Sequence, residues 1–148
     1  MSTPHVQAYI DGAWTDGSAG VSEYTAAYDG SVLGTFTICD APDVQRAIAA
    51  AKKAQTDWAA VPLLDKVDLL YRAYDLCAGP RRTCCGSVVW KPSEFCPGST
   101  ARYAQVLHDA GFPPGVFNFV PGFGDAGAAI VETTTVASWT SLRRGQAR

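Results

Sequence analysis

The sequence predicts an α/β fold, in which a β-hairpin and two helices precede a partial Rossmann-like parallel β-α-β unit. Two patterns predict it. In the first half, apolar residues recur at the spacing of helices that bury one face. In the second half, short apolar runs typical of strands covered on both faces alternate with helical patterns. The length of 148 residues favours one domain with a substantial core.

The first region, residues 1–78, opens with a predicted hairpin over residues 8–15. Its turn is Asp11-Gly12, a favoured two-residue hairpin turn, and the apolar and aromatic residues around it suit strands. A second turn at Asp29-Gly30 precedes another predicted strand over residues 31–39. The region is therefore expected to begin with short strands.

Two helices are expected next in the same region. Asp40 is a suitable N-cap and Pro42 fits a first turn, so the first helix is predicted over residues 41–59. The second is predicted to start at Pro62 and to end at Gly79-Pro80. Each carries an apolar stripe, formed by Val44, Ala47, Ile48, Ala51 and Trp58 in the first helix and by Leu64, Val67, Leu70, Tyr71, Tyr74 and Cys77 in the second.

The second region, residues 87–141, follows an irregular junction at residues 79–86 and has a different character. Strands and helices alternate within it, which predicts a parallel β-α-β unit with a right-handed crossover. The expected elements are a strand at 88–90, a helix at 99–110 that ends at Gly111, a strand at 116–120 and a helix at 125–132.

Composition argues against several classes of partner. Twelve basic and 14 acidic residues give a formal net charge of −2, so no basic patch is expected to hold a nucleic acid. No apolar run approaches the roughly 18 residues of a membrane-spanning helix, and the N-terminus does not resemble a secretory signal. A cytoplasmic location is therefore expected. Five cysteines without a C-x-x-C pair and only two histidines predict no metal site.

Two groups of residues are candidates for ligand binding. Gly122, Gly124 and Gly127 match G-x-G-x-x-G between a predicted strand and a predicted helix. Such glycines let a phosphate approach free N–H groups at a helix N-terminus, or simply form a turn. Lys91 and Glu94 follow the strand at the end where open α/β sheets bind ligands. They suit a pair of vicinal hydroxyls, or are a solvated lysine and glutamate on a loop.

The motifs "VVWKPSE" and "LHDAGFPPGVFNFVPGFGDAGAAIVE" closely resemble the coenzyme-binding segment of the aldehyde dehydrogenase superfamily. The stretches "YIDGAWTDG", "APDVQRAIAAAKKAQTDWAAV" and "KVDLLYRAYDLC" resemble that family's N-terminal region, so the resemblance covers residues 6–135. It implies that Lys91 and Glu94 hold the adenosine ribose of NAD or NADP. It also implies that Gly122, Gly124 and Gly127 form the turn beside the adenine half.

The resemblance also implies an oxidoreductase reaction, the NAD(P)-dependent oxidation of an aldehyde to a carboxylic acid. The family's long segment before the ribose-binding strand, its nucleophilic cysteine and its glutamate base have no counterpart here, and residues 142–148 form a divergent tail. We therefore expect a truncated, internally deleted chain that is inactive alone. The alternatives are a nucleotide-binding remnant, a remnant that pairs with itself or with a full-length relative, and a decayed reading frame.

Overall fold

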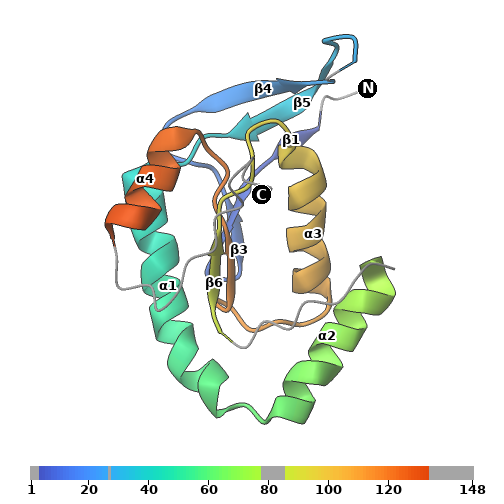
Figure 1. The fold of residues 1–148 in the computed structure, drawn as a ribbon, viewed down its shortest axis with the longest axis vertical. Coiled ribbons are helices and arrows are strands. Elements are labelled where there is room, and N and C mark those ends of the chain that lie inside the picture. The colour runs from blue at the N-terminus through green and yellow to red at the C-terminus, as the bar shows by residue number, and fades with distance from the viewer. Residues whose placement is uncertain (1–3, 27, 78–85, 134–148) are drawn as a thin grey trace, which may run out of the picture.

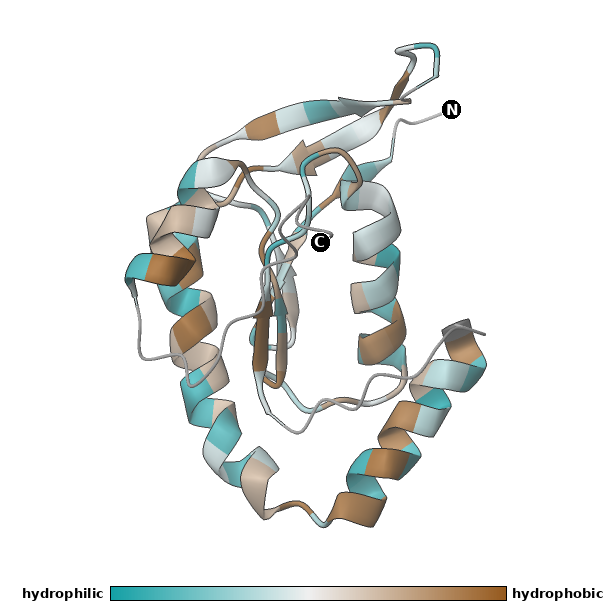
Figure 2. Ribbon diagram, viewed as in Figure 1, coloured by the Kyte–Doolittle hydropathy of each residue, from teal (hydrophilic) through white to brown (hydrophobic). Residues whose placement is uncertain are grey.

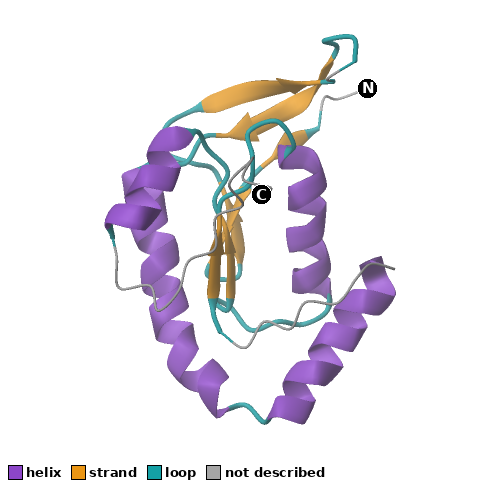
Figure 3. Ribbon diagram, in the orientation of Figure 1, coloured by secondary structure: helices purple, strands orange, loops and turns teal. Residues whose placement is uncertain are grey.

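The computed structural model describes residues 4–26, 28–77 and 86–133. Seven strands and four helices form in this part of the chain, grouped around two small sheets (Figures 1 and 3). In chain order they are β1 (His5–Val6), β2 (Ala8–Ile10), β3 (Ala13–Thr15), β4 (Val21–Thr25), β5 (Val32–Thr37), α1 (Ala41–Ala60), α2 (Leu63–Cys77), β6 (Val88–Trp90), α3 (Pro97–Asp109), β7 (Phe117–Phe119) and α4 (Gly124–Glu132).

The predicted hairpin is confirmed as β2 and β3, which pair antiparallel with Ile10 opposite Ala13. Asp11 and Gly12 both have positive φ angles, 51° and 83°, as a two-residue turn that follows the strand twist requires. The backbone N–H of Asp11 donates a hydrogen bond of 3.1 Å to the side chain of Asn118, the middle residue of β7, which fastens the turn to that strand. The hairpin is thus joined to the second half of the chain.

The larger sheet has the strand order β3-β2-β7-β6. The parallel pairing of β6 with β7, in which Val89 lies opposite Asn118, confirms the predicted β-α-β unit. β2 joins it antiparallel, with Tyr9 opposite Phe119. The three residues of β6 are half-buried rather than fully covered, because β6 is the last strand of the sheet that the structure describes.

The second sheet, in the order β1-β5-β4, includes two strands that the sequence did not predict. β1 has only two residues and pairs parallel with β5, while β4 pairs antiparallel with β5. The turn at Asp29-Gly30 lies between β4 and β5, as expected of a hairpin connection, and Gly30 has a φ of 74°. The strand predicted over residues 31–39 is confirmed as β5.

The first predicted helix is confirmed as α1, and all five residues of its apolar stripe are buried. α1 and α4 cover one face of the larger sheet, and α3 covers the other (Figure 1). β2 contributes to both sides, since Ala8 and Ile10 pack toward α1 while Tyr9 packs toward α3. Apolar residues accordingly line the strands between the helices in Figure 2.

The second helix is confirmed as α2, but its apolar stripe is largely uncovered in the described structure. Leu64 is 77% exposed and Tyr74 is 43% exposed, whereas Ala73 is buried. The reason is that α2, among the described elements, packs mainly against α3 and lies away from the two sheets (Figure 1). Gly79-Pro80, the predicted end of the helix, lies outside the described residues, as does the side chain of Cys77.

Candidate functional site

Lys91 and Glu94 lie together at the carboxyl end of β6. Lys91 follows the strand directly, and its Nζ atom is 3.8 Å from Oε2 of Glu94. The same ammonium group donates a hydrogen bond of 3.0 Å to the carbonyl oxygen of Pro92. The Lys91 side chain is 17% exposed and the Glu94 side chain 36% exposed, so a mostly covered cation faces a more open carboxylate.

The glycine motif meets this pair at one position. A Cβ atom added at Gly127 would lie 3.4 Å from Cδ of Lys91, so the lysine stem rests on the bare backbone of α4. A larger side chain at position 127 would press the lysine away. The structure therefore brings Lys91, Glu94 and Gly127 into one cluster.

The other two glycines have different surroundings. A Cβ at Gly122 would lie 2.9 Å from the carbonyl oxygen of Cys39, so this glycine allows the loop after β7 to approach the end of β5. A Cβ at Gly124 would meet nothing within 4 Å. Gly124 is the first residue of α4, and Phe123 before it makes no side-chain hydrogen bond to the first turn. Gly122 thus allows close packing, Gly124 leaves the start of α4 open, and Gly127 makes room for Lys91.

Acidic side chains border the same loop, which the sequence reading did not bring out. Asp125 lies exposed in the first turn of α4. On the other side, Asp40 follows Cys39 and accepts a 2.5 Å hydrogen bond from Ser18 Oγ. The buried Asp43 accepts hydrogen bonds from Ser18, from the backbone N–H of Asp40 and from Arg46. The available signals were an acid in a first helical turn for Asp43 and Asp125 and an acid at an N-cap for Asp40.

Neither cysteine whose side chain is described is prepared for nucleophilic chemistry. Burial, and after it the negative charge of Asp43, raises the pKa of the Cys39 thiol to about 12. Cys96 is exposed at the start of α3, and its thiol donates a 3.9 Å hydrogen bond to the carbonyl oxygen of Ser93. A thiolate, not a thiol, is the attacking species, so Cys39 is inert near neutral pH.

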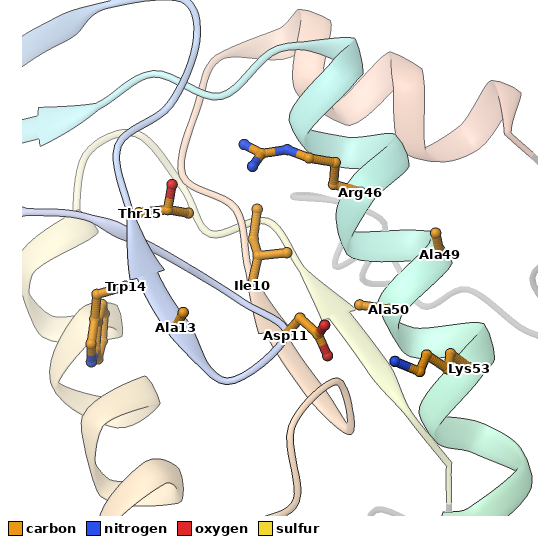
Figure 4. A pocket seen from close by; sticks show the side chains of 9 residues that line it. All are labelled: Ile10, Asp11, Ala13, Trp14, Thr15, Arg46, Ala49, Ala50 and Lys53. Atoms are coloured by element: carbon orange, nitrogen blue, oxygen red, sulfur yellow. The ribbon is translucent and has the colours of Figure 1, made fainter.

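A separate groove of about 680 Å³ lies between the hairpin and α1 (Figure 4). Nine residues line it, and its charged side chains are Asp11, Arg46 and Lys53. Arg46 is already bound to Asp43. The groove is open and was not predicted from the sequence. Within the described residues, no three His, Cys, Asp or Glu side chains gather closely enough to hold a metal ion, and no helix is long and apolar enough to cross a membrane.

Parts of the sequence are similar to known aldehyde dehydrogenases. A family model described as "Aldehyde dehydrogenase family" matches the chain in two segments, residues 14–85 and 78–140. Betaine aldehyde dehydrogenase 2 of Rhizobium meliloti (strain 1021) is 43% identical over 60 residues, which cover 40% of this chain and 12% of that protein. Human aldehyde dehydrogenase 1A1 is 51% identical over 53 residues, covering 35% of this chain and 11% of that protein.

Solved structures share the fold. An NAD-dependent aldehyde dehydrogenase from Sinorhizobium meliloti superposes with a TM-score of 0.80 at 20% identity, over 90% of this chain and 44% of that one. A Pseudomonas syringae aldehyde dehydrogenase solved with NAD⁺ and octanal superposes with a TM-score of 0.74 at 23% identity, over 84% of this chain and 42% of that one.

The matched regions are short relative to these proteins. The matched part of the chain spans about one eighth of the curated relatives and less than half of the solved chains. The family match nevertheless extends from residue 14 to residue 140, far more than half of the 148 residues. The chain therefore belongs to the aldehyde dehydrogenase family.

Proposed function

We propose that the chain binds the adenosine part of a nicotinamide dinucleotide, NAD or NADP. Lys91 and Glu94 would hold the ribose hydroxyls, and Gly122, Gly124 and Gly127 would form the turn beside the adenine half. The observation that carries the proposal is the cluster of Lys91, Glu94 and Gly127 at the carboxyl end of a parallel strand. Ligands of open α/β sheets bind at that end.

The chemistry of the cluster fits a ribose. An ammonium group has three N–H donors, and the Pro92 carbonyl takes one of those of Lys91, which leaves two for hydroxyl oxygens. The Glu94 carboxylate accepts hydrogen bonds from hydroxyl groups. The 3.8 Å between the two charged groups is longer than a hydrogen bond, so neither group saturates the other. When bound, the dinucleotide would supply a hydride acceptor.

The family reaction, oxidation of an aldehyde to a carboxylic acid, is proposed not to occur on this chain alone. Cys39 is a buried neutral thiol, and the Cys96 thiol donates its hydrogen bond to a carbonyl oxygen, which cannot take up its proton. The residues described here therefore bind and orient a nucleotide without attacking an aldehyde. The expected result is no aldehyde-dependent formation of NADH by the pure protein. Steady turnover would contradict this part of the proposal.

The binding proposal is tested by calorimetric titration with NAD⁺. Lys91→Ala and Glu94→Ala should each weaken binding at least tenfold, since hydrogen bonds to charged groups contribute about 1.5–3 kcal/mol. Lys53→Ala, which removes an exposed lysine from the separate groove, is the matched control and should leave the affinity unchanged. If the wild type and all three variants bind NAD⁺ with equal affinity, Lys91 and Glu94 do not hold the ribose.

A second candidate function is association with another protein, which the exposed apolar residues of α2 favour. Leu63, Leu64 and Leu76 are 62%, 77% and 55% exposed in the described structure. We propose self-association or pairing with a full-length aldehyde dehydrogenase through these exposed apolar residues of α2. Leu64→Glu should abolish any concentration-dependent dimer seen by sedimentation and any retention on an immobilised full-length enzyme. A wild-type protein that is monomeric and unretained would exclude it.

The division of the chain into residues 1–78, 87–141 and 142–148 remains a prediction. Its last segment lies outside the described residues. The first two regions share one sheet through the pairing of β2 with β7. Separate expression of residues 1–78 would test whether the first region folds without the second.

A further inference from the structure

The groove between the hairpin and α1 carries charged groups at both of its ends. Arg46 and Lys53 are seven residues apart, which places them on one side of α1 and about 10 Å apart along the helix axis. In Figure 4 the Arg46 guanidinium group reaches toward the hairpin at one end of the groove, and the Lys53 ammonium group faces Asp11 at the other. The lining also includes four apolar side chains, those of Ile10, Ala13, Ala49 and Ala50.

The charged groups of the groove retain the capacity to bind a ligand. Arg46 donates to Asp43, but a guanidinium group has five N–H donors, and this side chain is 56% exposed. Among the described residues, no hydrogen bond or ion pair occupies the Lys53 ammonium group or the Asp11 carboxylate. The three groups that face the groove sum to one positive charge, which favours a ligand with one negative charge.

The loop before β7 holds both walls of the groove in place. A Cβ atom at Gly115 would lie 2.7 Å from the carbonyl oxygen of Ala50, so the loop packs directly against α1. The same loop meets the hairpin, because a Cβ atom at Gly12 would lie 2.9 Å from Cβ of Pro114. One loop thus spaces the hairpin from α1, and a ligand loses little free energy to ordering the site.

The C-terminal end of a peptide has the groups that this arrangement fits. A guanidinium group binds a carboxylate with two parallel hydrogen bonds, which suits Arg46 to a free C-terminal carboxylate. In a trans peptide the N–H and C=O groups point in opposite directions, so one peptide group can donate to Asp11 and accept from Lys53. Three extended residues span about 10 Å, which matches the separation of Arg46 from Lys53 along α1.

We propose that this groove binds the C-terminal end of an extended polypeptide. Arg46 holds the terminal carboxylate, while Asp11 and Lys53 hold a peptide group further upstream from opposite walls. The apolar lining packs against the small side chains between them. This inference goes beyond the proposed function, because neither Lys91 nor Glu94 lines the groove.

The test is a calorimetric titration of the full chain with N-acetyl-trialanine and with its C-terminal amide. The free acid should bind at least tenfold more tightly than the amide, since amidation removes the charge that Arg46 binds. Asp11→Asn and Lys53→Ala should each weaken the binding of both peptides about threefold to tenfold, and both variants should still prefer the free acid. Saturating NAD⁺ should leave these affinities unchanged.

A substitution that fills the groove tests where the peptide binds. Ala49 is exposed on α1 and lines the groove, and leucine is a good helix former. The Ala49→Leu variant should therefore fold and should bind the free acid at least tenfold more weakly than the wild type. Thr56→Leu, at an exposed position of α1 outside the groove, is the matched control and should bind like the wild type.

Four results would overturn the inference. If the folded wild type does not bind the free acid at millimolar concentration, the groove does not hold a peptide end. If the amide binds as tightly as the acid, the carboxylate is not recognised. If Ala49→Leu binds like the wild type, the peptide binds elsewhere. If unblocked trialanine binds ten times more tightly than the acetylated form, the groove takes free tripeptides instead of polypeptide ends. None of these results would bear on NAD⁺ binding at Lys91 and Glu94.

Discussion

The stem of Lys91 rests on the backbone of Gly127, with Cδ 3.4 Å from the position that a Cβ atom would take. This contact joins the end of β6 to the first turns of α4 and sets the direction from which the ammonium group approaches Glu94. A glycine within a helix lowers helix stability by about 0.8–1.0 kcal/mol relative to alanine. At position 127 this loss of helix stability is offset by the space that the glycine leaves for the Lys91 side chain.

Gly127→Ala is therefore expected to have opposite effects on stability and binding. The helix should gain up to about 1 kcal/mol in the free energy of unfolding, because alanine is the better helix former. The new methyl group would lie in van der Waals contact with Cδ of Lys91, 3.4 Å away, and should weaken NAD⁺ binding by restricting the lysine stem. Urea unfolding and calorimetric titration measure the two effects. A variant with unchanged affinity would show that the position of the lysine stem is unimportant.

Gly12 in the hairpin turn and Gly20 before β4 offer a matched pair of glycine substitutions. Gly12 and Gly20 both have positive φ angles, 83° and 97°, but a Cβ at Gly12 would lie 2.9 Å from Cβ of Pro114, whereas one at Gly20 would meet nothing within 4 Å. Gly20→Ala should lower the free energy of unfolding by about 1 kcal/mol through backbone strain alone. Gly12→Ala should cost at least about 1 kcal/mol more. Equal losses in urea unfolding would mean that the turn does not pack on Pro114.

Asp43 should make the protein sensitive to acid. Burial alone would raise its pKa, but hydrogen bonds from Ser18, Arg46 and Asp40 outweigh burial, and the pKa of Asp43 is lowered from 3.8. Its contribution to stability is therefore complete above pH 3.8 and is lost as the pH falls toward the lower folded value. Asp43→Asn should lower the free energy of unfolding at pH 7 by about 2–3 kcal/mol, because charged hydrogen bonds are lost.

Urea unfolding between pH 3 and pH 7 measures this dependence. The wild-type protein should lose stability at the acidic end by more than the Asp43→Asn variant does. Asp57→Asn, which alters an exposed acid on α1, should resemble the wild type. Parallel curves for wild type and Asp43→Asn would contradict the assignment.

Tyr9 should contribute through one hydrogen bond between the hairpin and α3. Its hydroxyl lies 2.9 Å from Nδ1 of His108, and its ring packs 5.0 Å from that of Trp14. Tyr9→Phe keeps the ring and should lower the free energy of unfolding by about 1 kcal/mol. Burial raises the pKa of Tyr9 above 10.0, so the wild type should also lose stability as the pH rises past 10. Tyr103→Phe, at an exposed ring, is the control.

Local signals predicted most elements of the fold. The Asp11-Gly12 turn, the Asp40 cap and the period of the α1 stripe each act within a few residues, and each is confirmed. The pairing of β2 with β7 joins residues more than 100 positions apart, and nothing local in either strand marks it. β1 was missed because two residues are too few for an alternation to show.

The candidate site could be predicted in part for the same reason. Lys91 and Glu94 lie three residues apart after a recognisable strand, so their proximity follows from the local chain. The sequence motif gives the same role to all three glycines, whereas in the structure each one has different neighbours. The contact between Gly127 and Lys91, and the acids around the loop, depend on how α4 and α1 pack beside β6. That packing is a tertiary property.

The central claim is that Lys91 and Glu94 hold the ribose of a nucleotide beside α4. The most direct measurement is a nitrogen–proton NMR titration of the ¹⁵N-labelled chain with NAD⁺. We expect the NAD⁺-induced shifts to cluster at amides of residues 91–94 and 122–127. The same titration of the Glu94→Ala variant should show no such shifts. Shifts centred on the groove at Arg46 and Lys53, or no shifts at millimolar NAD⁺ in a folded protein, would contradict the account.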